Sequence, residues 1–283
     1  MRNLAVLMTC HNRRENTLKC LKALFLNAIP EDIHIRVFLV DDGSNDGTGD
    51  FVSDQFPDVV LIRGDGTLYW NGGMRVAFGA ALEMDFDFYL WLNDDTFLFL
   101  NALSGLLMSY QFLPKDCRDT AILSGTTIDP MTKASSYGGQ KWNSTWKGLD
   151  FRFVEPGAQP IECDTMNGNC VLIPRNVAQR VGNLEKEFIH SMGDIDYGLR
   201  AKSLGCSIWV SAGFVGECTE NPRADSYYDR ALSPKVRLHK MLHPKGLPIR
   251  QWKLMTKRHL GIFWFVYWLL PYVRALLLPQ VRK

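Results

Sequence analysis

The chain has 283 residues, of which 46% are hydrophobic and 22% charged, and this composition excludes disordered and collagen-like proteins. Its seven Cys residues include no CxxC pair, which argues against a disulfide framework or a zinc site and favours a reducing compartment. The net charge of +2 hides a division: residues 231–283 carry 11 basic and no acidic residues, whereas residues 1–230 carry 21 basic and 30 acidic residues, a charge of −9. A basic tail on an acidic body suggests a nucleic-acid or anionic-membrane partner.

Short apolar runs alternate with helical patterns over the first 125 residues. The apolar runs predict strands over 4–10, 35–40, 59–62, 88–92 and 121–123. Apolar residues at helical spacing predict helices over 15–28, 46–55, 73–84 and 97–109. This alternation predicts an α/β domain with a mostly parallel sheet and helices on both faces. Residues 126–160 suggest hairpins or long loops over the sheet, and the rhythm partly returns with a helix over 195–204.

Polar, Gly-rich or acidic clusters follow the first four predicted strands, at 9–14, 41–48, 64–73 and 93–96. In open parallel sheets, ligands bind beyond the carboxyl ends of the strands. Each cluster alone is also good turn or helix-capping chemistry. Adjacent carboxylates such as Asp94 and Asp95, however, repel each other unless a cation lies between them, and Mg²⁺ commonly bridges such groups to substrate phosphates. A dinucleotide or P-loop site is excluded, because the sequence contains neither glycine motif.

The clusters also carry a resemblance to a known family. The matching segments are 6–12, 40–48, 70–73, 92–96 (in the position of the DXD motif) and 193–196, which together span about 4–220. With these segments the chain resembles glycosyltransferase family 2 enzymes of GT-A fold, especially the bacterial rhamnosyltransferase-like branch. The resemblance implies a GT-A domain over 1–225, with a nucleotide-sugar half over 1–125 and an acceptor and base half over 126–225. Residues 226–283 would form a separate basic and apolar helical region.

The resemblance also implies roles for individual residues. Asp194 would be the general base, Asp95 the ligand of Mg²⁺ or Mn²⁺, and Asp94 a neighbour of the ribose. The nucleotide-sugar pocket would include Thr9, Asn12, Arg13, Asp42, Ser44, Gly66, Trp70, Asn71 and Gly72. The acceptor side would include Asn167, Gly168, His190 and Asp196, and the aromatic segment 137–146 could contribute to the same face.

The chemistry of these residues agrees with those roles. A carboxylate that takes the proton of a sugar hydroxyl accelerates transfer by roughly 10²–10⁴-fold. Asp194 precedes a predicted helix, whose dipole would keep it ionised, although simple capping is the alternative use of this residue. Asp196 and Arg200 are spaced for an ion pair within the same helix, which is a structural alternative for Asp196.

Two departures from the family pattern concern the metal. Asn93 replaces the first Asp of the DXD motif. Many relatives have a metal-contacting His after the base helix, whereas this chain has Glu217 and Cys218 in that region. Either Glu217 replaces the His, or the ion has one fewer protein ligand.

The basic tail has its own pattern. Ser233 and Pro234 predict the start of a helix that ends near 243. Residues 260–273 are uncharged and rich in Trp and Tyr but fall short of the roughly 20 residues that span a bilayer. We therefore expect a monotopic or re-entrant element on the cytoplasmic face of the bacterial inner membrane. The alternatives are packing on the domain or in a homodimer, and nucleic acid is not expected.

The sequence thus predicts a metal-dependent inverting glycosyltransferase. Its donor would be a nucleotide-diphosphate sugar and its acceptor a lipid-linked or cell-surface polysaccharide. A sugar-nucleotide nucleotidyltransferase is the rival enzyme, and an inactive membrane scaffold of the same fold is the rival without activity.

Overall fold

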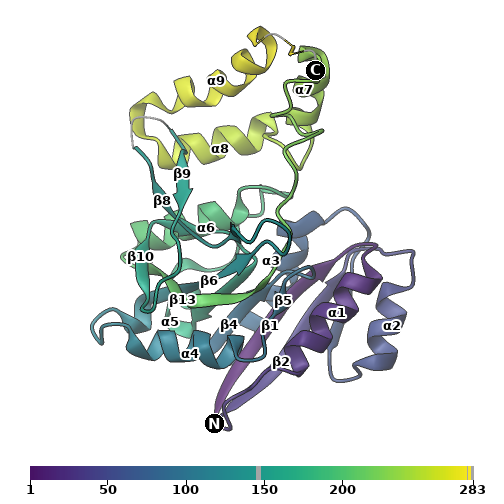
Figure 1. The fold of residues 1–283 in the computed structure, drawn as a ribbon, viewed down its shortest axis with the longest axis vertical. Helices are drawn as coiled ribbons and strands as arrows, with labels where there is room; N and C mark the ends of the chain where they lie inside the picture. Colours follow the sequence, from purple (N-terminus) through teal and green to yellow (C-terminus); the bar gives the residue numbers. More distant parts are fainter. Residues whose placement is uncertain (145–147, 279, 282–283) are drawn as a thin grey trace.

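The structure, a computed structural model, describes residues 1–144, 148–278 and 280–281 (Figure 1). Its N-terminal half alternates strands and helices as predicted, in the order β1 (Arg2–Cys10), α1 (Arg14–Phe25), β2 (Ile33–Asp41), α2 (Thr48–Gln55), β3 (Val60–Arg63), α3 (Tyr69–Leu82) and β4 (Phe88–Leu92). These four strands are parallel neighbours in the order β3-β2-β1-β4. Their carboxyl ends therefore meet at one edge of the sheet.

The second half of the domain adds strands of both directions. Its elements are β5 (Phe97–Leu98), α4 (Ala102–Phe112), a 3₁₀ turn (Arg118–Thr120), β6 (Ala121–Ile128), β12 (Cys170–Pro174), α5 (Arg175–Val181), α6 (Gly193–Ser203) and β13 (Ser207–Glu217). β12 lies antiparallel between β4 and β6, while β6 and β13 are parallel. The sheet is therefore mixed, with its parallel part at the N-terminal side.

The segment predicted as hairpins or long loops, together with the residues just after it, contains five short strands, two of which pair with the main sheet. They are β7 (Ser135–Tyr137), β8 (Gly139–Trp142), β9 (Phe151–Phe153), β10 (Ile161–Cys163) and β11 (Thr165–Met166). β8, β9 and β11 form a separate three-stranded sheet. Trp142 packs on Phe151 with ring centroids 4.4 Å apart, so this aromatic residue serves packing. Trp146 of the same aromatic segment lies outside the described residues, as do the basic residues Arg282 and Lys283 of the tail.

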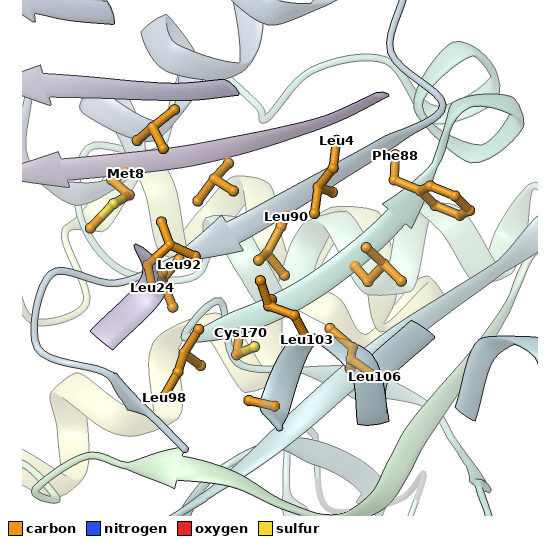
Figure 2. Close-up of a cluster of buried hydrophobic side chains, with 14 of the residues drawn as sticks. Leu4, Met8, Leu24, Phe88, Leu90, Leu92, Leu98, Leu103, Leu106 and Cys170 are labelled. Carbon is orange, nitrogen blue, oxygen red and sulfur yellow. The ribbon is translucent and has the colours of Figure 1, made fainter. Parts of the chain in front are cut away.

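Alternate residues of β1 enter two different cores. Leu4, Val6 and Met8 pack with apolar residues of α1, β4 and α4, as Figure 2 shows for Leu4, Met8 and their neighbours. Ala5 and Leu7 point to the opposite face, where they join residues of α3, α5 and α6. Because successive side chains of a strand alternate between faces, a strand covered on both sides must be apolar throughout. This explains the uninterrupted apolar run at 4–8.

Two helices begin four or five residues away from their predicted starts. α3 begins at Tyr69 rather than 73, because the Asp42 carboxylate accepts a hydrogen bond from the Tyr69 amide at 2.9 Å and holds the first turn. The polar motif at 70–73 therefore belongs to a helix. The helix predicted from 97 begins only at Ala102, since residues 97 and 98 pair with the end of β13 as a short strand.

The tail folds back on the domain. It contains α7 (Pro234–Leu242), α8 (Ile249–His259), a 3₁₀ turn (Gly261–Phe263) and α9 (Trp264–Leu277), and Figure 1 shows these helices beyond the carboxyl ends of the parallel strands. The Ser233 hydroxyl accepts from the Val236 amide, which confirms the predicted start of α7. Trp252 and Met255 of α8 share a core with Phe188 and Leu199 of the domain. Among the described helices, none has both the length and the apolar character needed to cross a bilayer.

A buried carboxylate fixes this docking. Asp196 has no exposed surface and accepts hydrogen bonds from Arg200 Nε at 2.8 Å, Arg258 Nη1 at 2.8 Å and His259 Nε2 at 2.9 Å. Arg258 also pairs with Glu185 at 2.7 Å. Burial alone would raise the pKa of Asp196, but the hydrogen bonds from His259 and Arg200 and the nearby cationic charges lower it below its ordinary value. The side chain thus joins α6 to the end of α8.

Replacing this carboxylate should loosen the tail. We expect Asp196→Asn to lower the free energy of unfolding by about 3 kcal/mol, because it leaves buried cations without their partner. The stabilisation from a lowered pKa is present above the ordinary value of 3.8 and is lost as the pH falls through the folded-state value, so the variant should differ most from the wild type near neutral pH. Urea unfolding at pH 7 and pH 3 measures both effects.

Asp50→Asn is the matched control, because Asp50 pairs with Arg63 on an exposed surface. It should change the free energy of unfolding by less than about 1 kcal/mol. Equal effects of the two substitutions would contradict the role of Asp196.

Candidate functional site

A cavity of about 1890 Å³ opens at the carboxyl ends of the parallel strands and extends to the tail. Most of the residues predicted for a site line it together: Thr9, Arg13, Asp42, Gly66, Trp70, Asp94, Asp95, Asn167, Gly168, His190 and Asp194. They come from the end of β1 and the loop after it, the loops after β2, β4 and β11, the loop after β3 with the start of α3, and the loop before α6 with its start. The fold therefore brings groups from six segments of the chain to one space.

Two adjacent carboxylates after β4 form the most acidic part of the cavity. Arg13 bridges them, with Nη1 2.9 Å from Asp94 and Nη2 2.7 Å from Asp95. Asp94 is 4% exposed, whereas the side chain of Asp95 is 27% exposed. Burial, opposed by the Arg13 charge and aided by the Asp95 charge, raises the pKa of Asp94 to about 7. The Arg13 guanidinium thus offsets the repulsion between the two carboxylates.

The same carboxylates fit a divalent ion of the Mg²⁺ type. Such ions use one or two protein carboxylates and take their other oxygen ligands from phosphates and water. Among the described residues, no cluster of three or more His, Cys, Asp or Glu side chains is placed to hold a metal, so the protein supplies few ligands. Asp95 is the more accessible of the pair, and a further cation would oppose the raised pKa of Asp94, whose largest cause is burial.

The structure bears on whether Glu217 replaces the family's metal-contacting His or the ion has one fewer protein ligand. Glu217 does not line the cavity, and its carboxylate lies 3.9 Å from Lys133. Cys218 instead lies beside Asp95, with Sγ 3.7 Å from Oδ1. Burial and the Asp95 charge raise the pKa of Cys218 to about 12, so the group is a neutral thiol, a poor ligand for a hard cation. This geometry favours one fewer protein ligand over substitution by Glu217.

A chain of contacts links the acidic pair to the predicted base. The Asn93 side chain accepts a hydrogen bond from the Trp70 indole at 2.7 Å. The Trp70 ring lies against Gly168, whose amide donates to the Asp194 carboxylate at 2.9 Å. Asn93, which departs from the DXD pattern, therefore orients Trp70. Sequence reasoning missed this role, since only the fold places 70, 93 and 168 together.

Asp194 lies at the start of α6 and is partly accessible from the cavity. Its carboxylate accepts from the Gly168 amide and from its own neighbour Ile195 at 2.8 Å. Burial raises the pKa of this carboxyl above its ordinary value, and the hydrogen bonds from the Gly168 and Ile195 amides oppose the shift. A raised pKa makes the carboxylate a better proton acceptor.

Five residues predicted for the site do not line the cavity: Asn12, Ser44, Asn71, Gly72 and Asp196. Asn12 and Ser44 bind each other's loops, since the Asn12 amide donates to Ser44 Oγ at 2.8 Å. Asn71 is fully buried and donates to the carbonyls of 185 and 188, which fixes the loop before α6. Asp196 forms the ion cluster with the tail, so its structural alternative is the one observed.

Two further residues of the cavity, Asp42 and His190, make contacts that the sequence did not predict. Asp42 uses both carboxylate oxygens on the backbone amides of Gly66 and Tyr69, so it shapes the pocket wall as well as lining it. His190 lines the cavity, and burial, together with the charges of Lys245 and His243 from the tail, lowers its pKa to about 4. Nothing in the sequence predicts that tail residues line the cavity, because this depends on how the tail folds back on the domain.

Comparison with known proteins agrees with this geometry. Residues 5–182, more than half of the chain, match the profile of glycosyl transferase family 2. The chain belongs to this family. No curated protein matches the sequence. The fold is similar to that of a solved mannosyltransferase from Pyrobaculum calidifontis, in complex with GDP-Man and Mn²⁺, at a TM-score of 0.54 and 14% identity, over 97% of this chain and 72% of that one.

The family match confirms the GT-A fold, with its α/β layers, and the general class of glycosyltransferase. It favours that class over the nucleotidyltransferase alternative. The helices of the tail lie beyond the part that the family profile matches.

The contact between Gly168 and Trp70 can be tested in this family 2 chain. A Cβ atom at 168 would lie 2.5 Å from Cη2 of Trp70, and Asn93 restrains that ring. Gly168→Ala should therefore lower the free energy of unfolding by about 1–3 kcal/mol. Thermal or urea unfolding measures this change, and the loss should shrink in a Trp70→Leu background.

Gly105→Ala is the control, because Gly105 lies in α4 and open space surrounds the position that its added Cβ atom would take. That substitution should be neutral or stabilise the protein by up to about 1 kcal/mol. If Gly168→Ala lowers the free energy of unfolding equally with Trp70 and with Trp70→Leu, the contact between Gly168 and the Trp70 ring is refuted.

Proposed function

We propose that this family 2 chain is a metal-dependent inverting glycosyltransferase that uses a nucleotide-diphosphate sugar, with Asp95 as the metal ligand and Asp194 as the general base. The observation that carries the proposal is the single cavity that contains both groups. The acidic pair marks the side for a metal and a diphosphate, and Asp194 marks the side for an acceptor hydroxyl. Trp70 lies between them, in contact with Gly168 and bonded to Asn93.

On the donor side, Asp95 would hold the ion, with Asp94 as a buried charge beside it. When bound, Mg²⁺ or Mn²⁺ stabilises the negative charge of a diphosphate leaving group. The solved mannosyltransferase of similar fold binds GDP-Man with Mn²⁺, which supports a donor of this class. Arg13 uses the same carboxylate oxygens, so a metal and Arg13 compete for them, and a displaced guanidinium is well suited to bind phosphate.

On the acceptor side, Asp194 would take the proton of the attacking hydroxyl. The new bond forms to the anomeric carbon while the bond to the diphosphate breaks, so the nucleotide leaves with the electron pair of the broken bond. The Gly168 amide and the Ile195 amide hold the carboxylate in one orientation. One displacement with one base inverts the anomeric configuration, which supports the inverting assignment.

The base can be tested by one substitution. Asp194→Asn keeps the size of the side chain and removes its basicity, so sugar transfer should fall by about 10²–10⁴-fold. Binding of nucleotide diphosphate with Mn²⁺ should persist in calorimetry. The control Asp54→Asn alters an exposed carboxylate of α2 and should leave turnover unchanged. Full turnover in Asp194→Asn would exclude this residue as the base, whereas an absence of sugar transfer in the wild type would favour the inactive-scaffold alternative.

Metal binding should depend on pH. Because burial raises the pKa of Asp94 to about 7, the carboxylate is largely protonated below this value and its attraction for a cation is lost. The affinity for Mn²⁺ should therefore weaken as the pH falls from 8 to 6, approaching about tenfold per unit below pH 7. Calorimetric titration with MnCl₂ measures this slope, and Asp94→Asn should flatten it. A wild-type affinity independent of pH would contradict the assignment.

We further propose that the acceptor is lipid-linked or belongs to a cell-surface polysaccharide, and that the tail binds the cytoplasmic face of the bacterial inner membrane. The support is a row of exposed apolar side chains on the last helical segment, including Ile262 (79% exposed), Phe265 (54%) and Leu269 (51%). Phe265 and Leu269, four residues apart, lie on one face of α9, and Ile262 belongs to the 3₁₀ turn just before it. Basic residues of α8 lie nearby, and Lys253 stacks over Trp264 at 5.8 Å. Apolar and basic groups together favour anionic lipid.

Sedimentation with lipid vesicles tests this surface. The triple variant Ile262→Ser, Phe265→Ser and Leu269→Ser should reduce binding to phosphatidylglycerol vesicles at least tenfold, because it removes apolar area that would enter the interface. Met131→Ser is the control, since Met131 is 85% exposed but lies between β6 and β7. Retention of binding in the triple variant would instead favour a dimer interface, which analytical ultracentrifugation detects.

A further inference from the structure

Arg237 of α7 is a buried cation for which the described residues supply no anionic partner. Its residue surface is 2% exposed, and it lines the large cavity. One terminal nitrogen donates to the Leu278 carbonyl, whereas Nε is buried and has no hydrogen-bond partner. Arg237 forms no ion pair with any described residue. A buried guanidinium is unfavourable unless an anion compensates it, so this side chain indicates a missing partner.

The other cations of the tail differ in whether a protein carboxylate lies beside them. Arg258 pairs with Asp196 and Glu185, and Lys240 pairs with Asp225, so cations that face protein carboxylates are satisfied. Arg274 and Lys245, which line the same cavity as Arg237, have no ion pair within the described part of the chain. Residues 231–283 contain no Asp or Glu that could supply one. The tail side of the cavity is therefore cationic, opposite the acidic side at Asp94 and Asp95.

The wall beside these cations is apolar. Leu270, Pro271, Ala275 and Leu278 line the cavity from α9, and Trp252 and Met255 line it from α8. Figure 1 shows α7 next to the end of α9, so the charged and apolar walls adjoin. The cavity is continuous with the space at Asp194. A ligand that fills the tail side would thus need an anionic group next to an apolar chain. Its other end would lie in the same cavity as Asp194.

We propose that this part of the cavity binds the phosphate or diphosphate ester of an acceptor that carries a long apolar chain, with Arg237 as the principal counter-charge. Arg274 and Lys245 complete the anion site, and α9 supports the chain. The planar guanidinium can bind two phosphate oxygens at once, which matches the unsatisfied Nε. This inference rests on the proposed function, because it assigns the acceptor of the same site.

Geranylgeranyl diphosphate, below its critical micelle concentration, is the probe for this site. Calorimetry is performed on the full chain in EDTA, because binding at Asp95 requires a metal and binding at Arg237 does not. We expect the wild type to bind the probe, Arg237→Met to weaken it at least tenfold, and Arg237→Lys to recover part of the loss. Arg274→Gln and Lys245→Gln should weaken it by about threefold to tenfold each. Arg250→Gln is the control, since Arg250 is exposed on α8 and does not line the cavity.

Three further ligands separate the sources of binding. Geranylgeraniol tests the chain alone, inorganic diphosphate tests the anion alone, and dihexanoyl phosphatidylglycerol represents a membrane headgroup. Each should bind at least tenfold more weakly than the probe. Equal binding of the phosphatidylglycerol would reassign the pocket to membrane lipid, and equal binding of geranylgeraniol would remove the role of Arg237.

Separate readouts keep the inference distinct from the proposed function. Arg237→Met should leave binding of nucleotide diphosphate with Mn²⁺ unchanged, and its melting temperature should not fall, because the variant removes an uncompensated buried charge. If Arg237→Met fails to fold, the exposed residues Arg274 and Lys245 decide the matter, and unchanged probe affinity in both variants refutes the site. Probe binding without nucleotide binding would instead refute only the proposed function.

Discussion

The buried carboxylate of Asp196 connects the two parts of the molecule. It holds Arg200 within α6 and Arg258 and His259 at the end of α8, with no surface exposed to solvent. The same helix begins with Gly193 and Asp194, so the group that docks the tail lies only two residues from the proposed base. Loss of the ion cluster would leave cations buried without a partner, and this penalty keeps the tail in place. The cavity exists in its present form only because of that docking.

The cavity has walls of opposite charge. Acidic side chains gather where the parallel strands end, and Arg13 alone of the cavity's described Arg and Lys side chains forms ion pairs with them. Unpaired cations gather on the tail side, around Arg237. A divalent ion with a diphosphate donor would suit the first wall, and an anionic acceptor the second. The near-neutral net charge of the chain thus combines two surfaces that face each other across one space.

Much of the fold could be predicted from the sequence. β4 has the predicted bounds, and the other parallel strands differ by a few residues, because runs of buried apolar residues mark a strand covered on both faces. Helix starts were less predictable. The start of α3 depends on the Asp42 carboxylate, which lies 27 positions away in the chain from Tyr69. The start of α4 at Ala102 rather than at 97 depends on the pairing of residues 97 and 98 with β13, more than 100 residues later in the chain. Local patterns contain no information on such contacts.

The candidate site shows the same division. The sequence by itself determined which strand ends carry carboxylates and that Asp194 opens a helix, since both follow from residue order. Only the tertiary structure decided that Asn71 and Asp196 are structural, that Asn93 orients Trp70, and that Cys218 rather than Glu217 lies beside Asp95. It also decided that the tail, predicted as a membrane element with packing on the domain as an alternative, forms a wall of the cavity. The physical reason is that burial and ion pairing depend on which distant segments pack together, and a carboxylate near a guanidinium has a different role from the same carboxylate in water.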